Sequence, residues 1–199
     1  MPYNEFNHLA LAANLKDYKY PKDRITRLLK SGEIIQIRKG IYVLGSKDRN
    51  GVLSKEILAN WIYGPSYISL EYALSYYNLI PERVEMITSV SPKRKKIFKT
   101  KIGDFIYFTL KANYYNFGYT TVKLNDGRNF LIATPEKAIA DKIYFENGVR
   151  TPKEILEFFT ENMRIELNDL KNLNYAFLNS IVSKFNKKKM YNLIKAIAD

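Results

Sequence analysis

The sequence predicts an α+β protein in two parts: an N-terminal winged helix-turn-helix, then an α+β domain with a central antiparallel sheet and C-terminal helices. Two observations predict this class. Apolar residues at helical spacing before Gly32 give way to alternating apolar and polar residues up to Leu44. Short β-rich stretches bounded by turn residues then fill the middle of the chain, and helical spacing resumes after Thr134.

Two helices are predicted at the start of the chain. Apolar residues three and four positions apart indicate a short helix over residues 5–13. Pro21 suits the first turn of a second helix, which Ser31 and Gly32 end. The remaining surface of this second helix is almost entirely basic or hydroxylic, because its buried stripe should consist of Ile25, Leu28 and Leu29.

A β-hairpin is predicted directly after the second helix. The period of the apolar residues changes to two, and the turn Lys39-Gly40 separates two short strands. Such a hairpin is only marginally stable alone, so it should pack on the preceding helices. The polar stretch Gly45–Gly51 indicates a linker. We therefore expect a winged-helix domain over residues 1–46 and an α+β domain over residues 52–199.

The second part should begin with helices over residues 53–63 and 69–77, where apolar residues recur at helical spacing. Five β-rich stretches between residues 84 and 133 indicate an antiparallel meander. Further helices should start at Thr134 and Thr151, because each threonine precedes a proline and Thr151 begins a capping-box pattern.

The formal charge of the chain is +12, and 23 of its 32 basic residues are lysines. An excess of Lys, Ile, Asn and Tyr is typical of AT-rich coding, so the total charge is a poor indicator of a polyanionic partner. The distribution of charge along the sequence is more informative than the total. Residues 93–133 carry nine Lys and Arg against two Asp and Glu, whereas residues 134–170 carry five against eight. The basic residues therefore gather in blocks.

Several classes of site are excluded by composition. Cysteine is absent and His8 is the single histidine, which excludes a disulfide framework, a thiolate metal site and chemistry that needs two histidines. No stretch approaches the roughly 18 apolar residues of a membrane-spanning helix, and no G-x-x-x-x-G-K-[ST] phosphate loop occurs. We therefore expect a cytoplasmic protein with no membrane partner, no metal and no cofactor.

A helix with a basic face, followed at once by a basic hairpin, is typical of winged helix-turn-helix DNA-binding domains. The helix would enter the major groove, where Arg24 and Arg27 would address guanine edges and Thr26 lies beside them. The alternative is a solvated helix face next to an ordinary basic turn. In the DNA-binding interpretation, phosphates would be bound by Lys22, Lys30, Arg38 and Lys39.

The stretch RITRLLKSGEIIQIRKGIYVLG, residues 24–45, resembles the N-terminal winged-helix domain of the AbiEi-type antitoxins. These are transcriptional regulators from abortive-infection operons, which are type IV toxin–antitoxin systems. The chain departs from the family pattern before Pro21, where about 20 residues leave little room for two full helices. The resemblance extends over most of residues 21–147 through YISLEYALSYYNLIPE, ITSVSPKRKKIFKTKIGDFIYFTL and FGYTTVKLNDGRNFLIATPEKAIADKIY.

The resemblance implies a DNA-binding repressor and antitoxin with two partners. The winged domain would bind operator DNA with inverted repeats in its own promoter and so autoregulate the operon. The second domain would counteract a nucleotidyltransferase-like toxin encoded beside it, a functional partner with which no stable complex is needed. On this interpretation the protein binds and does not catalyse.

A second basic run lies within the resemblance. We call it the second basic surface and expect it either to hold nucleic acid or to protect a β-edge from aggregation. Tyr107, Tyr114, Tyr115 and Tyr119 would be candidate stacking partners for bases, although tyrosine also simply suits strands. The second basic surface consists of Lys93, Arg94, Lys95, Lys96, Lys99 and Lys101.

The competing class is a nucleic-acid-processing enzyme, a nuclease or nucleotidyltransferase, which a winged domain delivers to its substrate. Gly45-Ser46 is similar to the glycine-serine pair of nucleotidyltransferases, but no Asp-x-Asp follows it. Glu136 and Asp141 could belong to a metal-dependent nuclease site, whereas Thr134-Pro135-Glu136 is also a simple helix start with an acid in its first turn. The helix start is the interpretation we adopt.

Overall fold

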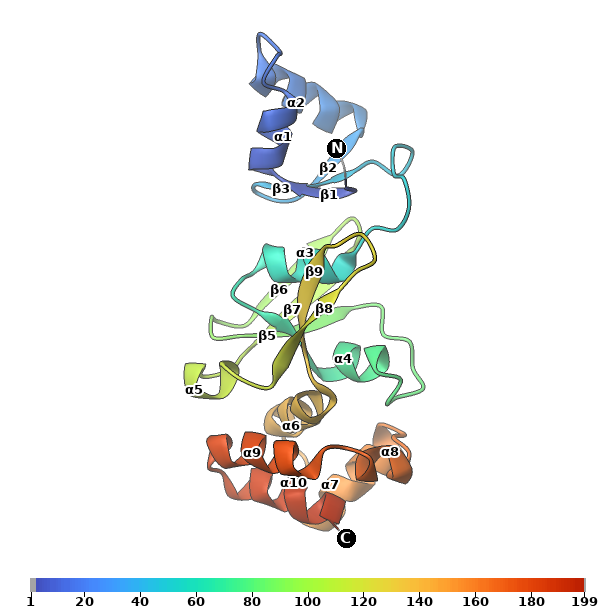
Figure 1. The fold of residues 1–199 in the computed structure, drawn as a ribbon, viewed down its shortest axis with the longest axis vertical. Helices are drawn as coiled ribbons and strands as arrows, with labels where there is room; N and C mark the ends of the chain where they lie inside the picture. The colour runs from blue at the N-terminus through green and yellow to red at the C-terminus, as the bar shows by residue number, and fades with distance from the viewer. Residues whose placement is uncertain (1–2, 199) are drawn as a thin grey trace.

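The computed structural model describes residues 3–198, which form an elongated α+β protein in three tiers (Figure 1). A small unit of two helices and a sheet lies at one end, a larger sheet lies in the middle, and a group of helices lies at the other end. The small unit, called here the N-terminal unit, comprises β1 (Glu5–Asn7), α1 (His8–Asn14), α2 (Pro21–Ser31), β2 (Ile34–Arg38) and β3 (Ile41–Leu44).

The predicted second helix and hairpin are confirmed at their predicted positions. Pro21 begins α2, and Gly32 ends it with a positive φ of 77° that suits a residue without a side chain. β2 and β3 pair as antiparallel strands around the turn Lys39-Gly40. One face of this hairpin packs with α1 and α2 around a core of Phe6, Leu11, Leu15, Leu28, Ile34 and Tyr42.

The prediction of a helix over residues 5–13 is wrong for its first turn. Glu5–Asn7 forms β1, which pairs antiparallel with β3 and gives a three-stranded sheet in the order β1-β3-β2. The Asn7 side chain then accepts a hydrogen bond from the backbone N–H of Ala10 and so begins α1 at His8. Strand pairing with a residue such as Val43, far away in sequence, overrides the local helical spacing.

Gly45 has a packing role at the end of the N-terminal unit. Its N–H donates to the carbonyl oxygen of Glu33 over 2.7 Å. A Cβ at this position would lie 2.1 Å from the carbonyl oxygen of Gly32, far inside van der Waals contact. Only glycine therefore fits where the chain leaves β3, which explains Gly45-Ser46 without nucleotidyltransferase chemistry.

The second unit, residues 55–198, is built on a six-stranded sheet in the order β6-β7-β5-β4-β9-β8. Helices α6 to α10 form the layer beyond the sheet (Figure 1). The elements are α3 (Lys55–Ile62), β4 (Tyr67–Ile68), α4 (Leu70–Tyr76), β5 (Ile87–Ser91), β6 (Lys96–Thr100), β7 (Gly103–Thr109), α5 (Ala112–Tyr115), β8 (Tyr119–Lys123), β9 (Asn129–Ala133), α6 (Pro135–Phe145), α7 (Pro152–Glu157), the π-helix Phe158–Asn162, α8 (Leu167–Lys171), α9 (Tyr175–Phe185) and α10 (Lys188–Ala198).

The α+β class is confirmed, but the predicted central antiparallel meander is wrong. The sheet is mixed, because β5 pairs parallel with β7 and β4 pairs parallel with β9. The two-residue strand β4 sits between β5 and β9, with Tyr67 opposite Val90 and Ile68 opposite Ile132. A strand of two residues leaves no alternating pattern in the sequence, so its insertion into the sheet gave no signal.

The predicted helix starts at Thr134 and Thr151 are confirmed. The Thr134 side chain accepts a hydrogen bond from the N–H of Lys137, and Pro135 is the first residue of α6. Thr151 and Glu154 form a complete capping box at the start of α7. No helix in residues 3–198 is long and apolar enough to cross a membrane.

The two units share a continuous apolar core. The face of the hairpin that points away from α1 and α2 contributes Ile41 and Val43 to the large core of the second unit. The stretch Gly45–Gly51 is tied down as well, because the Asn4 carboxamide donates to the carbonyl oxygen of Asn50 over 3.0 Å. The N-terminal unit is therefore held at a fixed position on the second unit.

An ion-pair cluster adds a second connection between the units. Arg128, next to the β8–β9 turn, forms salt bridges with Asp126 and with the fully buried side chain of Glu5. Its guanidinium lies 4.6 Å from the ring centre of Tyr3. Burial raises the pKa of the Glu5 carboxyl, and the charge of Arg128 opposes this rise.

Candidate nucleic-acid interface

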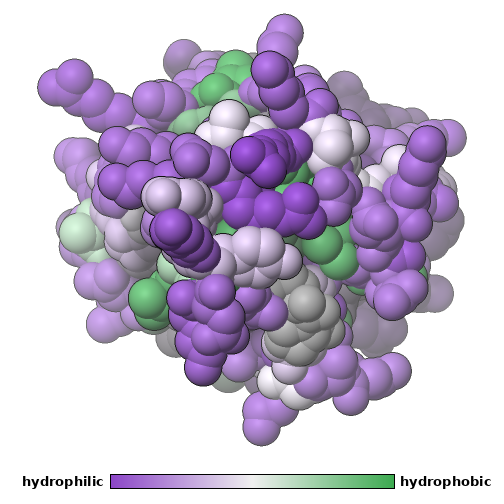
Figure 2. Space-filling view, turned by 90° about the horizontal axis from the view of Figure 1, so that it is seen from above, coloured by the Kyte–Doolittle hydropathy of each residue, from purple (hydrophilic) through white to green (hydrophobic). Residues whose placement is uncertain are grey.

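The outward face of α2 is the main candidate interface. Leu28 is buried beneath the helix and the other two predicted stripe residues pack against the same core. The face opposite this stripe forms the end of the molecule, where Figure 2 shows a mainly hydrophilic surface. Within the described part of the chain, no salt bridge involves the basic side chains of this face. Its exposed residues are Lys22, Asp23, Thr26, Arg27 and Lys30.

Arg24 is held differently from Arg27. Its guanidinium lies 3.7 Å from a carboxylate oxygen of Glu33 and 5.9 Å from the ring centre of Tyr18, and it is only partly exposed. Arg27 is exposed, and no salt bridge to it is formed among residues 3–198. Arg27 is therefore the arginine of α2 that is free to approach a base edge.

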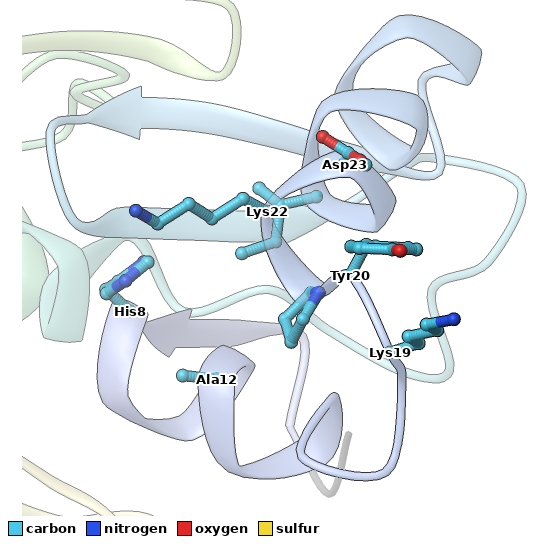
Figure 3. Close-up of a pocket in the computed structure, with 8 residues that line it drawn as sticks. His8, Ala12, Lys19, Tyr20, Lys22 and Asp23 are labelled. Carbon is cyan, nitrogen blue, oxygen red and sulfur yellow. The ribbon is translucent and has the colours of Figure 1, made fainter.

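Two pockets flank the first turn of α2. One, of about 490 Å³, is lined by both arginines together with Tyr18, Lys19, Tyr20 and Asp23. The other, of about 480 Å³, lies between α1 and α2, where Figure 3 shows Lys22 extending towards His8. These tyrosines and Lys19, which lie between the two predicted helices, were not singled out from the sequence. The sequence signal for this pocket was the pair of tyrosines, Tyr18 and Tyr20, directly before the basic helix; the structure shows that both are exposed.

Arg38 and Lys39, the two basic residues predicted at the hairpin turn, have different surroundings in the structure. Arg38 turns towards the second unit, where its guanidinium donates to the carbonyl oxygen of Ile62. It also lies 5.3 Å from the ring centre of Phe98. Lys39 is exposed at the turn, and the turn itself lies against α1 because the N–H of His8 donates to the carbonyl oxygen of Gly40 over 2.8 Å. Both side chains are exposed, but Arg38 is directed towards the second unit, whereas no side-chain contact of Lys39 is formed among residues 3–198.

The second basic surface lies on an edge of the sheet, since β6 pairs with β7 alone among the strands of residues 3–198. Its lysines rest on aromatic rings: Lys95 lies 5.1 Å from the ring centre of Phe108, and Lys96 lies 5.5 Å from that of Phe98. Lys93 lies 5.3 Å from the ring centre of Tyr63. Arg94, Lys99 and Lys101 are exposed. Edge protection and anion binding are both compatible with this arrangement.

The four tyrosines considered for base stacking are engaged inside the protein. The buried Tyr107 hydroxyl donates to the carbonyl oxygen of Ala59 over 2.6 Å, and burial raises the Tyr107 pKa. Tyr115 and Tyr119 stack on the buried Tyr67, and burial raises the pKa of Tyr115 to about 12. Tyr114 stacks on Phe185. The rings of Tyr107 and Tyr115 are therefore buried in the core, and those of Tyr114 and Tyr119 are partly buried and already stacked on other rings of the protein.

The two carboxylates considered for a nuclease site face the interior. Asp141 is fully buried, pairs with Lys137 at 2.8 Å, and accepts hydrogen bonds from the hydroxyls of Tyr67 at 3.0 Å and Ser69 at 2.8 Å. Glu136 accepts a hydrogen bond from the N–H of Asn174 over 3.0 Å. Residues 3–198 contain no cluster of three or more His, Asp or Glu side chains placed to hold a metal ion. Both acids serve the packing of α6.

Comparison with known proteins adds no family to this description: no family model matches the chain, and no curated protein matches it. The class that the fold defines is an α+β protein whose small N-terminal unit presents a basic helix.

Proposed function

We propose that the protein is a DNA-binding transcriptional regulator that inserts α2 into the major groove. The observation that carries the proposal is the outward face of α2, where Arg27 and two lysines are exposed beside Thr26 without protein partners among the described residues. An α-helix fits the major groove, where arginine pairs with guanine and lysines neutralise phosphates.

The arrangement around α2 supports a shortened winged helix-turn-helix. In this interpretation α1 is the positioning helix, α2 the recognition helix and β2–β3 the wing, while β1 supplies the third strand next to β3. Where complete winged domains have a helix before the positioning helix, residues 5–7 of this chain form β1, and a pocket lies open between α1 and α2. The pocket is lined there by His8, Ala12, Pro21 and Ile25.

Lys39→Ala is expected to weaken binding to the upstream DNA and to random DNA about equally, because a phosphate contact carries no sequence information. The salt dependence of the binding constant should fall by about one counterion. Fluorescence anisotropy of labelled duplexes at several salt concentrations measures both quantities. An unchanged affinity and slope would remove the turn from the interface. Lys123→Ala, at an exposed lysine of β8, is the matched control.

We propose further that the protein represses its own operon and acts as an antitoxin, with the second unit opposing a nucleotidyltransferase-like toxin. The support for this step is the resemblance of residues 67–144 to the AbiEi-type antitoxins. Expressing the neighbouring gene should arrest growth, and co-expression of this chain should restore it. A variant with α2 inactivated for DNA binding should still restore growth. Arrest that persists with the wild-type chain contradicts the antitoxin role and leaves DNA binding to be judged separately.

A further inference from the structure

A second cationic site lies at the end of the molecule opposite to α2 (Figure 1). The loop between α6 and α7 and the first turns of α10 enclose a pocket of about 410 Å³. Its volume is within the range of small-ligand sites. The pocket is lined by Arg150, Thr151, Lys188, Lys189 and Asn192.

The carboxylates near this pocket are already occupied within their own loop. Glu154 accepts hydrogen bonds from the backbone N–H groups of Arg150 and Thr151, at 2.8 and 3.0 Å. Glu146 lies 3.4 Å from the ammonium of Lys142. Among residues 3–198, neither Arg150 nor Lys188 has a salt-bridge partner, and both are exposed. These two cations are therefore not neutralised by a direct salt bridge, although the charges of Glu154 and Glu146 act on Arg150 and Lys189 from nearby.

The cations are also placed where the fold disfavours them. Lys187, Lys188 and Lys189 stand at the start of α10, an end of a helix that carries partial positive charge and favours anions. Lys189 is partly buried and its ammonium donates to the carbonyl oxygen of Glu146. Burial lowers the Lys189 pKa, the charge of Glu146 opposes this, and the cations Arg150 and Lys187 lower the pKa further.

A bound anion would relieve this repulsion and gain hydrogen bonds from the same groups. The guanidinium fork of Arg150 matches the oxygens of a phosphate, and Lys188 supplies a compact charge beside it. The Thr151 hydroxyl accepts the N–H of Glu154, so its own proton is free to be donated. The Asn192 amide nitrogen donates to the carbonyl oxygen of Arg150 over 2.8 Å and fixes that loop against α10.

We propose that this pocket binds a phosphate group, carried by a free nucleotide or by a nucleic-acid strand. Binding uses Arg150 and Lys188 as the principal cations, with Lys189 and Thr151 beside them. The site is separate from α2 and does not depend on the DNA-binding role proposed for that helix.

The test measures how much inorganic phosphate raises the unfolding temperature at constant ionic strength. A ligand that binds only the folded state raises this temperature. The full chain is compared with Arg150→Gln/Lys188→Gln and with the control Lys184→Gln/Lys195→Gln, which removes two exposed lysines of α9 and α10 outside the pocket. Wild type and control should be stabilised, and the pocket variant should bind phosphate about tenfold more weakly or worse.

Equal stabilisation of all three proteins overturns the proposal, since the phosphate would then act elsewhere. If the double variant fails to fold, the single change Lys188→Gln at an exposed position serves in its place. Adenosine 5′-monophosphate and a short single-stranded oligonucleotide are then added as competitors of phosphate. Competition by either supports the site, and the tighter competitor identifies the source of the phosphate group. If neither compound competes with phosphate, the proposal that the ligand is a nucleotide or a nucleic-acid strand is contradicted.

Discussion

Lys137→Met is expected to lower the free energy of unfolding by about 3–5 kcal/mol. The ammonium of Lys137 and the carboxylate of Asp141 are fully buried and 2.8 Å apart. Methionine fills the space of the lysine stem but leaves Asp141 charged in the core. The hydroxyls of Tyr67 and Ser69 still donate to that carboxylate, yet no cation remains beside it. Urea unfolding followed by circular dichroism measures the loss.

The matched control is Lys153→Met. Lys153 and Glu157 have the same i,i+4 spacing, but their side chains are 85% and 55% exposed, so this change should alter stability by less than about 1 kcal/mol. The double variant Lys137→Met/Asp141→Asn should be more stable than Lys137→Met alone, because the uncompensated charge is gone while an acceptor remains. Equal losses for the buried and exposed pairs would show that the α6 pair is not desolvated.

Arg27→Ala should reduce discrimination between the upstream DNA and random DNA by about 1–3 kcal/mol, which is roughly 5- to 150-fold in relative affinity. The reason is that Arg27 is the exposed arginine of α2, whereas Arg24 is partly held by Glu33 and Tyr18. Competition binding with labelled upstream duplex and unlabelled random duplex measures the ratio. Arg83→Ala, at a side chain that is 90% exposed on the second unit, is the control.

The loss of affinity for each of the two duplexes distinguishes a contact with a base from a contact with a phosphate. If Arg27→Ala weakens both duplexes by the same factor, the arginine contacts phosphate and base readout belongs to another residue. If Arg27→Ala and Arg83→Ala have identical small effects on both duplexes, α2 is not the contacting helix. Circular dichroism of both variants should match that of the wild type, because neither side chain contributes to a core.

Features governed by local rules could be predicted from the sequence. The proline start and glycine end of α2, the hairpin turn and the capped starts of α6 and α7 all depend on residues within a few positions of one another. The basic face of α2 followed from the same helical spacing that predicted its buried stripe. These features include the residues that we propose to contact DNA.

Features governed by distant contacts could not be predicted. β1 is a strand only because β3 lies beside it, and β4 joins the large sheet with too few residues to show a period. Arg38 ends β2 beside a basic turn, but its contacts with Ile62 and Phe98 of the second unit determine where its guanidinium lies. Sequence charge alone cannot show which cations the fold has already engaged.

The burial of the Lys137–Asp141 pair could not be predicted from the sequence either, although both residues lie in one helix. Its i,i+4 spacing is that of an ordinary exposed ion pair. The lysine stem is buried because it packs over Gly118, where an added Cβ would lie 2.9 Å from the Lys137 Cδ and where φ is +80°. A contact with Gly118, which lies directly before β8 and far from α6 in sequence, therefore contributes to the burial of the pair.

The most direct test of α2 as the DNA-contacting element is amide chemical-shift mapping of the isotope-labelled full chain with the duplex from upstream of its gene. We predict that the perturbed amides gather in residues 18–31, with Lys39 among them, and that they depend on salt as phosphate contacts do. Perturbations confined to residues 55–198 would contradict the central claim, because the N-terminal unit would then play no part in binding DNA.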